Sequence, residues 1–327
     1  MNNQNIEQRP FNEILDELFT NDPLPIYELH RLSDMSLDEH ETFRQRWTAV
    51  DVDRRRAIVR HLADLTEDNF TVDFVPVFMD CFADSDAAVR VAALDGLWDA
   101  TEIKLISPVI RLLQNDDSEE VRTAAAAALS HFVVLAEWDQ IPRRFAEPVV
   151  TALLAAYDDE KTAVTTRRAA LEALGSAHHP RIPDLIAKAY ESPDEGLQIS
   201  AVFAMGSSAD KGWLGIIMAE MENINPEMRV EAALAAGHLG SSDAVSYLEK
   251  LLEDEDVEVQ IAAITALGQI GGDTVHETLL QLAQNPEYDD LLEVIDEALE
   301  EMALFAGEFQ FLDFEEDDDL EDDTLLI

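Results

Sequence analysis

The stretch DEDVEVQIAAITALGQIGG, residues 254–272, decides the fold of this chain. It sets a capping carboxylate, Asp256, before an apolar run in which the small residues Ala263 and Ala266 share one helix face. Variants of the same phrase occur as DSDAAVRVAALDGLW at 84–98 and as NDDSEEVRTAAAAAL at 115–129. A phrase that recurs at a period of about 20–50 residues is typical of stacked repeat architectures. The sequence therefore predicts a chain of structural repeats.

The arginine of VRVAAL serves as an anchor for aligning the repeats. Equivalent positions follow at intervals of 31–35 residues, with a single interval of 45. The anchors are Arg55, Arg90, Arg122, Arg167, Gln198, Arg229, Gln260 and Glu293. Four residues before them stand Asp51, Asp86, Ser118, Ala163, Asp194, Asn225, Asp256 and Asp289. All but Ala163 can cap a helix N-terminus with a side-chain oxygen, so each unit is predicted to contain a capped helix.

Small residues follow the anchors at helical spacing. Three residues after the anchor stand Ala93, Ala125, Ala170, Ala201, Ala232 and Ala263. Small side chains allow a neighbouring helix to approach closely, so this stripe predicts a helix packed on both sides. A second amphipathic segment precedes each capped helix, for example at 74–82 and 105–113. Such helix pairs bury their apolar faces only by stacking on one another.

The phrase D-x-D-x-x-V-[RQ]-x-x-A-[AIL]-x-[AG]-L-G resembles the short HEAT-like repeat of the phycobilisome-lyase type, over about residues 43–300. The resemblance implies an all-α fold, a right-handed α-solenoid (superhelix) of about eight stacked helix pairs. It also implies a ladder in which Arg90, Arg122 and Arg229 pair with turn acids such as Asp84, Asp86 and Asp116. The ladder residues that we single out are Asp86, Arg90, Arg122, Asn225, Arg229 and Asp256. Their expected role is structural.

Three segments make up the predicted organisation. Residues 1–42 form an N-terminal helical cap or a separate docking element, and SLDE at 36–39 is a capping box that opens a helix through Trp47. Residues 43–307 form the repeat solenoid. Residues 308–327 form an acidic tail that is expected to be disordered after about residue 315, because nine of residues 313–323 are acidic.

The 45-residue interval marks a longer unit around 131–150. Trp138, Arg143, Arg144 and Phe145 gather there, and aromatic and arginine side chains are enriched at protein-binding hot spots. The segment is either a partner-binding surface or a longer helix and loop in which Trp138 covers the adjacent repeat.

Phenylalanines precede the acidic run at Phe309, Phe311 and Phe314. They are the second speculative partner-binding group. One interpretation is an interaction peptide for a basic partner, or a pseudo-ligand for the protein's own cationic site. The other is a tail that only promotes solubility.

The charge of the chain is strongly negative and uneven. The sequence has 22 Lys and Arg against 69 Asp and Glu, a net charge of −47. From Val230 to Ile327 one basic residue, Lys250, stands against 28 acids. Such a field repels phosphate backbones, so we expect no nucleic acid partner. The acidity either attracts a basic protein or is an adaptation to a salty cytoplasm, which the low lysine content would also suit.

Location and chemistry leave few further signals. No apolar run is long enough to span a membrane, and the N-terminus has no secretion signal. The single cysteine, Cys81, is expected to be buried. We therefore expect a cytoplasmic protein with no membrane partner. A di-iron hydroxylase with HEAT-like repeats uses His-Glu pairs at corresponding repeat positions. Here His40-Glu41 and His276-Glu277 are the only such pairs, and their contexts differ. We expect no catalytic residue, no metal and no cofactor.

The leading functional hypothesis is a non-catalytic protein–protein interaction scaffold or adaptor. Its partner is expected to be basic, or to carry a basic segment, and to bind on the solenoid surface. The alternative is a bilin-lyase-like or other enzyme-accessory protein with a concave apolar pocket, which rests on fold analogy.

Overall fold

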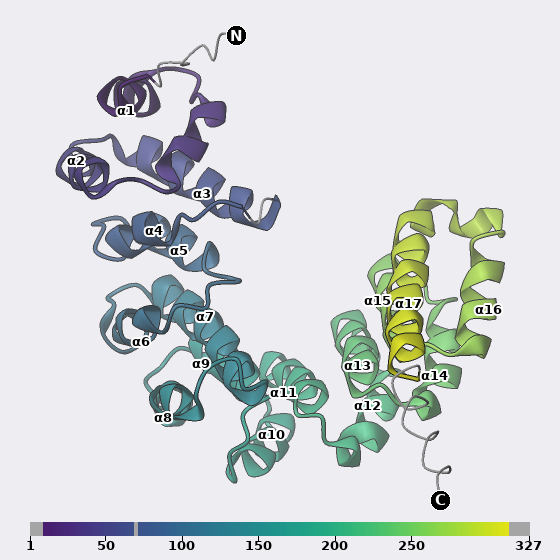
Figure 1. The fold of residues 1–327 in the computed structure, drawn as a ribbon. Coiled ribbons are helices and arrows are strands. Elements are labelled where there is room, and N and C mark those ends of the chain that lie inside the picture. The colour runs from purple at the N-terminus through teal and green to yellow at the C-terminus, as the bar shows by residue number, and fades with distance from the viewer. Residues whose placement is uncertain (1–8, 69–70, 314–327) are drawn as a thin grey trace, which may run out of the picture. The chain divides into compact units, whose positions relative to one another are not determined.

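The computed structural model describes residues 9–68 and 71–313, which form helices and turns without a strand (Figure 1). The chain divides into two compact units, residues 1–179 and 180–327. The helices of the N-terminal unit are α1 (Phe11–Thr20), α2 (Leu37–Trp47), α3 (Val52–Asp68), α4 (Val75–Cys81), α5 (Ala87–Asp95), α6 (Ile106–Asn115), α7 (Glu119–Glu137), α8 (Ala146–Asp158) and α9 (Val164–Leu174). Short 3-10 helices are η1 (Ile26–Leu32), η2 (Ile103–Leu105) and η3 (Arg143–Phe145).

The C-terminal unit repeats the same alternation. Its helices are α10 (Ile182–Tyr190), α11 (Glu195–Ser207), α12 (Leu214–Glu220), α13 (Pro226–Leu239), α14 (Val245–Leu251), α15 (Val257–Ile270), α16 (Asp273–Leu282) and α17 (Leu292–Asp313). The 3-10 helices are η4 (Lys211–Trp213), η5 (Ser242–Ala244) and η6 (Pro286–Leu291).

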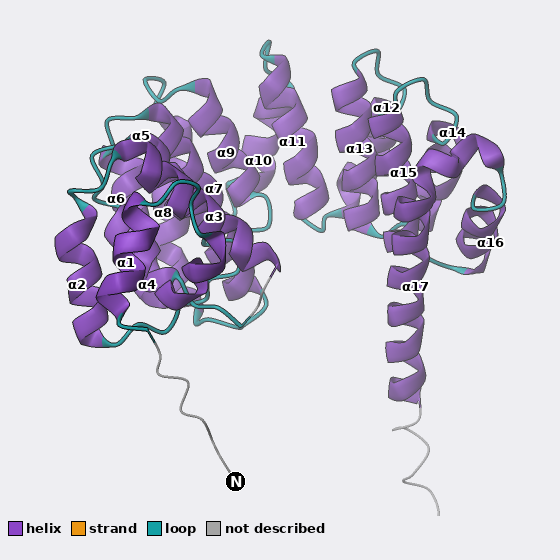
Figure 2. Cartoon of the chain, turned by 90° about the horizontal axis from the view of Figure 1, so that it is seen from above, coloured by secondary structure: helices purple, strands orange, loops and turns teal. Residues whose placement is uncertain are grey.

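Within each unit the capped helices form one layer, and the helices that precede them form another. In the N-terminal unit α3, α5, α7 and α9 contact one another in series. In the C-terminal unit α11, α13, α15 and α17 do the same, and α10, α12, α14 and α16 each pack on the capped helix that follows (Figure 2). The predicted solenoid of stacked helix pairs is therefore confirmed.

The predicted caps are present in most units. The side chains of Asp86, Ser118, Asp194, Asn225 and Asp256 each accept a hydrogen bond from a main-chain N–H in the first turn of the following helix. These bonds satisfy donors that the helix itself leaves unpaired.

The cap of the last unit was predicted at the wrong residue. Asp289 lies inside the 3-10 helix η6, and Asn285 caps η6, accepting a hydrogen bond from the Glu287 N–H at 3.1 Å. The proline that follows, Pro286, suits the first position of a helix because it has no N–H to satisfy.

The small-residue stripe forms the close packing that the sequence predicts. The six alanines of the stripe are all fully buried: Ala93, Ala125, Ala170, Ala201, Ala232 and Ala263. Glycines allow the closest approach, since a Cβ on Gly206 would lie 2.6 Å from Ala235 Cα, and one on Gly237 would lie 2.8 Å from Ala266 Cα. Adjacent capped helices therefore meet through their backbones.

The same contact corrects the register of the last unit. A Cβ on Gly268 would lie 2.8 Å from Ala298 Cβ, so Ala298 occupies the place that Ala235 and Ala266 hold in the preceding units. Ala298 lies six residues after Leu292, as Ala266 does after Gln260. The anchor of the last unit is thus Leu292, and the alignment on Glu293 was one residue too late.

The arginine ladder links neighbouring turns, but not in every unit. Arg90 donates two hydrogen bonds to Asp116, at 2.8 and 2.7 Å. Arg229 binds Asp254 in the same way, at 2.8 and 2.7 Å. Arg122 instead donates to the main-chain carbonyl of Asp116 at 2.6 Å. The expected pairing of Arg122 with a turn carboxylate is therefore wrong: its partner in the turn is a main-chain carbonyl.

Asp86 is bound from the preceding unit by Arg56, at 2.9 and 2.6 Å, and not by an anchor arginine. The hydrogen bonds from Arg56, opposed by desolvation and helped by the Val89 N–H, lower the pKa of Asp86 from 3.8 to about 2. Because the pKa is lower in the folded state, this contact stabilises the fold above about pH 4 and stops doing so as the pH falls through about 2.

Replacing Arg56 by glutamine is expected to raise the pKa of Asp86 toward 3.8, because the largest favourable interaction of the carboxylate is lost. Carbon-13 NMR titration of the carboxyl groups measures this change. Arg60→Gln, which removes the neighbouring contact to Asp95 at 3.0 Å, should leave Asp86 unchanged. An Asp86 pKa that stays near 2 in Arg56→Gln would show that the capping bonds alone hold it there.

The N-terminal segment contains the helices predicted for it. Ser36 and Glu39 form the predicted capping box, with the Ser36 N–H donating to Glu39 at 2.9 Å and the Glu39 N–H donating to Ser36 Oγ at 3.3 Å. Phe43 stacks on Trp47, with ring centroids 5.0 Å apart. Trp47 Nε1 donates to Asp84 at 2.9 Å, which ties α2 to the turn after α4.

Helix α17 continues into the segment predicted as a tail. Residues 308–313 are the last part of this helix, so the predicted boundary at 308 falls inside it. Phe309 and Phe311 lie in this part of α17, and Phe314 lies outside the described residues, as does the rest of the tail. In the described ranges no helix combines the length and the apolar character that a membrane span needs.

Candidate partner-binding surfaces

The longer unit around 131–150 owes its shape to a reversal of the chain after α7. Asp139 adopts a left-handed conformation with φ of 57°, and the N–H groups of Gln140 and Ile141 both donate to the Leu135 carbonyl, at 2.8 and 3.2 Å. Trp138 ends α7 and leaves 71 % of its surface exposed. It therefore does not cover the adjacent repeat, which was one of the two interpretations of this segment.

The other three residues singled out in this segment lie just after the reversal. Arg143 is exposed and lies 3.6 Å from a Glu137 carboxylate oxygen and 3.9 Å from one of Asp139. Arg144 is exposed and places its guanidinium 4.7 Å from the ring centre of Phe145. The site residues predicted here thus gather at one corner of the N-terminal unit, although nearby carboxylates offset the charge of Arg143.

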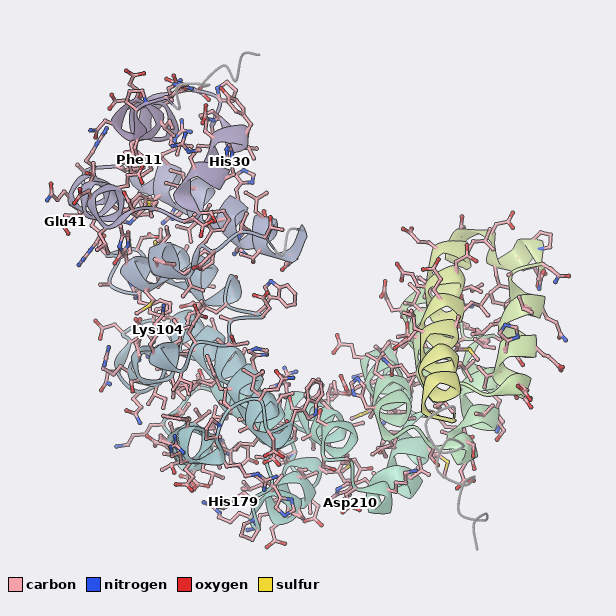
Figure 3. The ribbon with its side chains drawn as sticks, viewed as in Figure 1. Phe11, His30, Glu41, Lys104, His179 and Asp210 are labelled. Atoms are coloured by element: carbon pink, nitrogen blue, oxygen red, sulfur yellow. The ribbon has the colours of Figure 1, made fainter. Side chains whose placement is uncertain are left out.

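A cavity of about 440 Å³ adjoins this corner, between α7, α8 and the turn after α9. Arg143, Glu147, His178 and His179 contribute polar side chains to its lining. Glu137 accepts a hydrogen bond from the main-chain N–H of His178 at 2.9 Å, which fixes the turn against α7. Figure 3 labels His179 in this turn.

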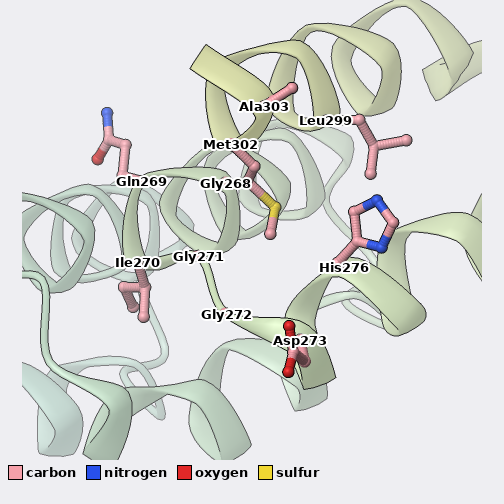
Figure 4. A pocket seen from close by; sticks show the side chains of 10 residues that line it. All are labelled: Gly268, Gln269, Ile270, Gly271, Gly272, Asp273, His276, Leu299, Met302 and Ala303. Carbon is pink, nitrogen blue, oxygen red and sulfur yellow. The ribbon is translucent and has the colours of Figure 1, made fainter. Parts of the chain in front are cut away.

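A larger cavity, of about 570 Å³, lies in the C-terminal unit between the turn after α15 and helix α17 (Figure 4). Its lining combines Ile270, Leu299 and Met302 with His276 and the pair Gly271 and Gly272. Both glycines have positive φ, 67° and 99°, so the turn requires residues without a side chain. The cavity is open to solvent, and its polar lining includes Gln269, Asp273 and His276.

The described residues contain no group of three or more His, Cys, Asp or Glu side chains that could hold a metal ion. His40 pairs with Asp80 at 2.8 Å, whereas His276 lines the cavity in the C-terminal unit, so the two His-Glu pairs occupy unrelated surroundings. Cys81 is fully buried as predicted, and burial raises the pKa of its thiol well above the usual value.

One surface of the C-terminal unit escaped the sequence analysis. Along each capped helix, the positions one, five and nine residues after the anchor lie on one face and remain partly exposed. In α11, α13 and α15 the first two positions hold mostly apolar residues. We call these five residues the apolar stripe: Ile199, Phe203, Val230, Leu234 and Ile261. With the corrected anchor Leu292, the same positions in α17 are Glu293, Glu297 and Glu301, which we call the glutamate edge.

The N-terminal unit has a different surface at the equivalent positions. Arg56 and Arg60 occupy them in α3, and both are engaged by carboxylates of α5 or the turn before it. Val91 in α5, Thr123 in α7 and Arg168 in α9 follow at the first position. The C-terminal unit therefore has its own pattern: the first position is apolar in three adjacent helices and is a glutamate in the fourth. The signal lies in the sequence, as an apolar residue directly after the anchor in three successive repeats.

The comparisons with known proteins agree with the repeat assignment. The family model described as HEAT repeats matches residues 216–300, and the one described as HEAT repeat matches residues 105–134. The chain therefore contains HEAT repeats. The narrower assignment to the phycobilisome-lyase type is not supported by these matches. No curated protein matches the chain.

Solved structures resemble the chain in fold. The Escherichia coli protein YibA is 19 % identical, with a TM-score of 0.42, over 90 % of this chain and 97 % of that one. Human deoxyhypusine hydroxylase in complex with glycerol is 17 % identical, with a TM-score of 0.34, over 80 % and 95 % of the two chains. Importin beta is 15 % identical, with a TM-score of 0.45, over 85 % of this chain and 44 % of its own. At these identities the likeness carries no information about activity.

Proposed function

We propose that this chain of HEAT repeats is a non-catalytic scaffold that holds a basic segment of a partner protein on its C-terminal unit. The observation that supports the proposal is the distribution of charge: from Val230 onward, Lys250 is the single basic residue among 28 acids. The partner contributes the positive charge that this surface lacks.

The carboxylates of the C-terminal unit differ in whether they already have a partner. Asp254 accepts two hydrogen bonds from Arg229 and serves the ladder. On α17, by contrast, Glu293, Asp296 and Glu297 are exposed to solvent. Clustered exposed charges of one sign raise the rate of encounter with an oppositely charged partner, and the effect weakens as salt shortens the screening length to less than about 10 Å.

Neutralising four exposed carboxylates of α17 is expected to weaken partner binding about tenfold at 0.1 M salt and to have little effect at 0.5 M. The substitutions are Glu293→Gln, Asp296→Asn, Glu297→Gln and Glu300→Gln. The immobilised full chain first captures proteins from the native lysate at 0.1 M salt. The best-retained protein is then purified, and calorimetry measures its dissociation constant with each variant.

A matched variant controls for the total charge. It neutralises four exposed carboxylates of the N-terminal unit: Glu13→Gln, Asp38→Asn, Asp117→Asn and Glu160→Gln. This variant should bind as tightly as the original chain. Tight binding that does not respond to salt, or equal weakening by both variants, would argue against an electrostatic surface on the C-terminal unit.

A further inference from the structure

We infer that the apolar stripe and the glutamate edge together bind an extended segment in which three apolar side chains recur at every third residue and a Lys or Arg stands three residues beyond one end of this run. The inference rests on the proposed function and names the face and the type of sequence that the partner presents. The molecule that occupies this surface is a segment of a partner protein.

One row of equivalent positions runs across four helices of the C-terminal unit. Ile199, Val230 and Ile261 hold the same position in α11, α13 and α15, and Glu293 holds it in α17. These helices contact one another in series (Figures 1 and 2). The row therefore crosses the unit from apolar to acidic residues. A second row, one helical turn further along, contains Phe203, Leu234 and Thr265 and ends at Glu297. Both rows thus have the same polarity.

The spacing of the helices in this row matches the repeat of an extended segment. Packed helices lie about 8–10 Å apart, and here glycine–alanine contacts hold the capped helices at close approach. A polyproline II segment advances about 3.1 Å per residue with three residues per turn, so every third side chain returns to the same face after about 9.3 Å. A β-strand cannot present every third side chain to one face, because its side chains alternate. The polyproline II conformation therefore matches one apolar side chain to each helix.

The carboxylates around the apolar stripe favour a basic occupant. Glu227 and Glu258 lie at the start of α13 and α15, on the same face as the stripe, and both are exposed. Together with Glu293 they place carboxylates beside and beyond the apolar row. This arrangement opposes occupation by the chain's own residues 314–327, which are mostly acidic. A second copy of the chain, with a net charge of −47, is opposed for the same reason.

The probe is a fluorescent peptide with leucine at its first, fourth and seventh positions, lysine at its tenth, and proline elsewhere to hold the polyproline II conformation. A second peptide has the reverse order, because the stripe does not dictate the chain direction. The control peptide has the same composition with the leucines at alternate positions. Fluorescence anisotropy with the full chain measures binding, and we expect one of the two spaced peptides to bind about tenfold more tightly than the control.

Variants of the full chain test the two parts of the surface separately. Leu234→Ser is expected to weaken binding of the spaced peptide about tenfold, while Ile224→Ser, at a side chain that is 96 % exposed in the turn before α13, should have no effect. Glu293→Lys is expected to weaken binding about tenfold at low salt. A peptide with glutamate in place of its lysine should recover the loss in Glu293→Lys, an outcome that a purely structural role of Glu293 would not produce.

Four results would overturn the inference. Equal binding of the spaced and control peptides would remove the requirement for spacing, and no recovery by the charge-swapped peptide would remove the role of Glu293. Displacement of the probe by a synthetic peptide of residues 314–327 would make the chain's own C-terminal residues the occupant, and a dimer that the probe dissociates would make a second copy the occupant. The failure would remain distinct from that of the proposed function. A captured basic partner whose binding responds to the α17 carboxylates but not to Leu234→Ser would preserve the scaffold and remove the apolar stripe from it.

Discussion

Replacing Asp84 by alanine is expected to lower the free energy of unfolding of the N-terminal unit by about 3–5 kcal/mol. Asp84 and Arg55 form an ion pair at 2.9 Å, and their side chains are only 3 % and 8 % exposed. Asp84 also accepts hydrogen bonds from Trp47 Nε1 and from the Asp86 N–H, each at 2.9 Å. One substitution therefore leaves a buried guanidinium without its carboxylate, and it deprives two further donors of their acceptor.

Urea unfolding, followed through tryptophan fluorescence, measures this loss. With a dependence of about 2–3 kcal/mol per molar urea for a unit of this size, the midpoint should fall by about 1–2.5 M. Trp47 reports directly on the site because its indole donates to Asp84.

Asp16→Ala provides the comparison for a pair at the surface. Asp16 and Arg46 lie 2.5 Å apart, but the side chain of Asp16 is 67 % exposed, so its removal should cost less than about 1 kcal/mol. Similar effects of Asp84→Ala and Asp16→Ala would show that the buried Arg55–Asp84 pair contributes no more to stability than an exposed pair.

Gly206→Ala is expected to destabilise the C-terminal unit by about 2–3 kcal/mol, although alanine is the better helix former. The added Cβ would lie 2.6 Å from Ala235 Cα and 2.8 Å from Ala235 Cβ. Because the obstacle is the backbone of α13, no rotation of a side chain relieves the contact. The two helices must separate, and the packing around Gly206 is lost.

Gly215→Ala is the matched control for Gly206→Ala. Gly215 lies in α12, and nothing stands within 4 Å of the place its Cβ would take. The substitution should therefore stabilise the unit by up to about 1 kcal/mol through helix propensity. Thermal unfolding followed by circular dichroism compares the two variants. If both substitutions are neutral or stabilising, close helix approach at Gly206 does not determine the stability of this unit.

The repeat fold could be predicted from sequence because its causes are local. A capping side chain such as Asp256 acts on main-chain groups two or three residues away, and a stripe of alanines acts on the one helix that contains it. The capping box at Ser36 and the burial of Cys81 followed from the same kind of short-range pattern.

Other features depended on residues far apart in the chain. In the last unit Asn285 caps η6, and the contact of Gly268 with Ala298 moves the anchor from Glu293 to Leu292. That shift by one residue, about 100° around a helix, separates a buried position from an exposed one. The glutamate edge became visible only after this correction.

The sequence alone determined that capped helices recur, that their small faces are buried, and that the acidic charge gathers in the C-terminal third, because each of these depends on residue type and short-range spacing. Tertiary structure decided which carboxylate each arginine binds. Arg90 reaches the Asp116 carboxylate across 26 residues, whereas Arg122 donates to the main-chain carbonyl of the same residue, six residues before it. Tertiary structure also decided that Ile199, Val230, Ile261 and Glu293 form one row, because a row across helices exists only once their registers are set by backbone contact.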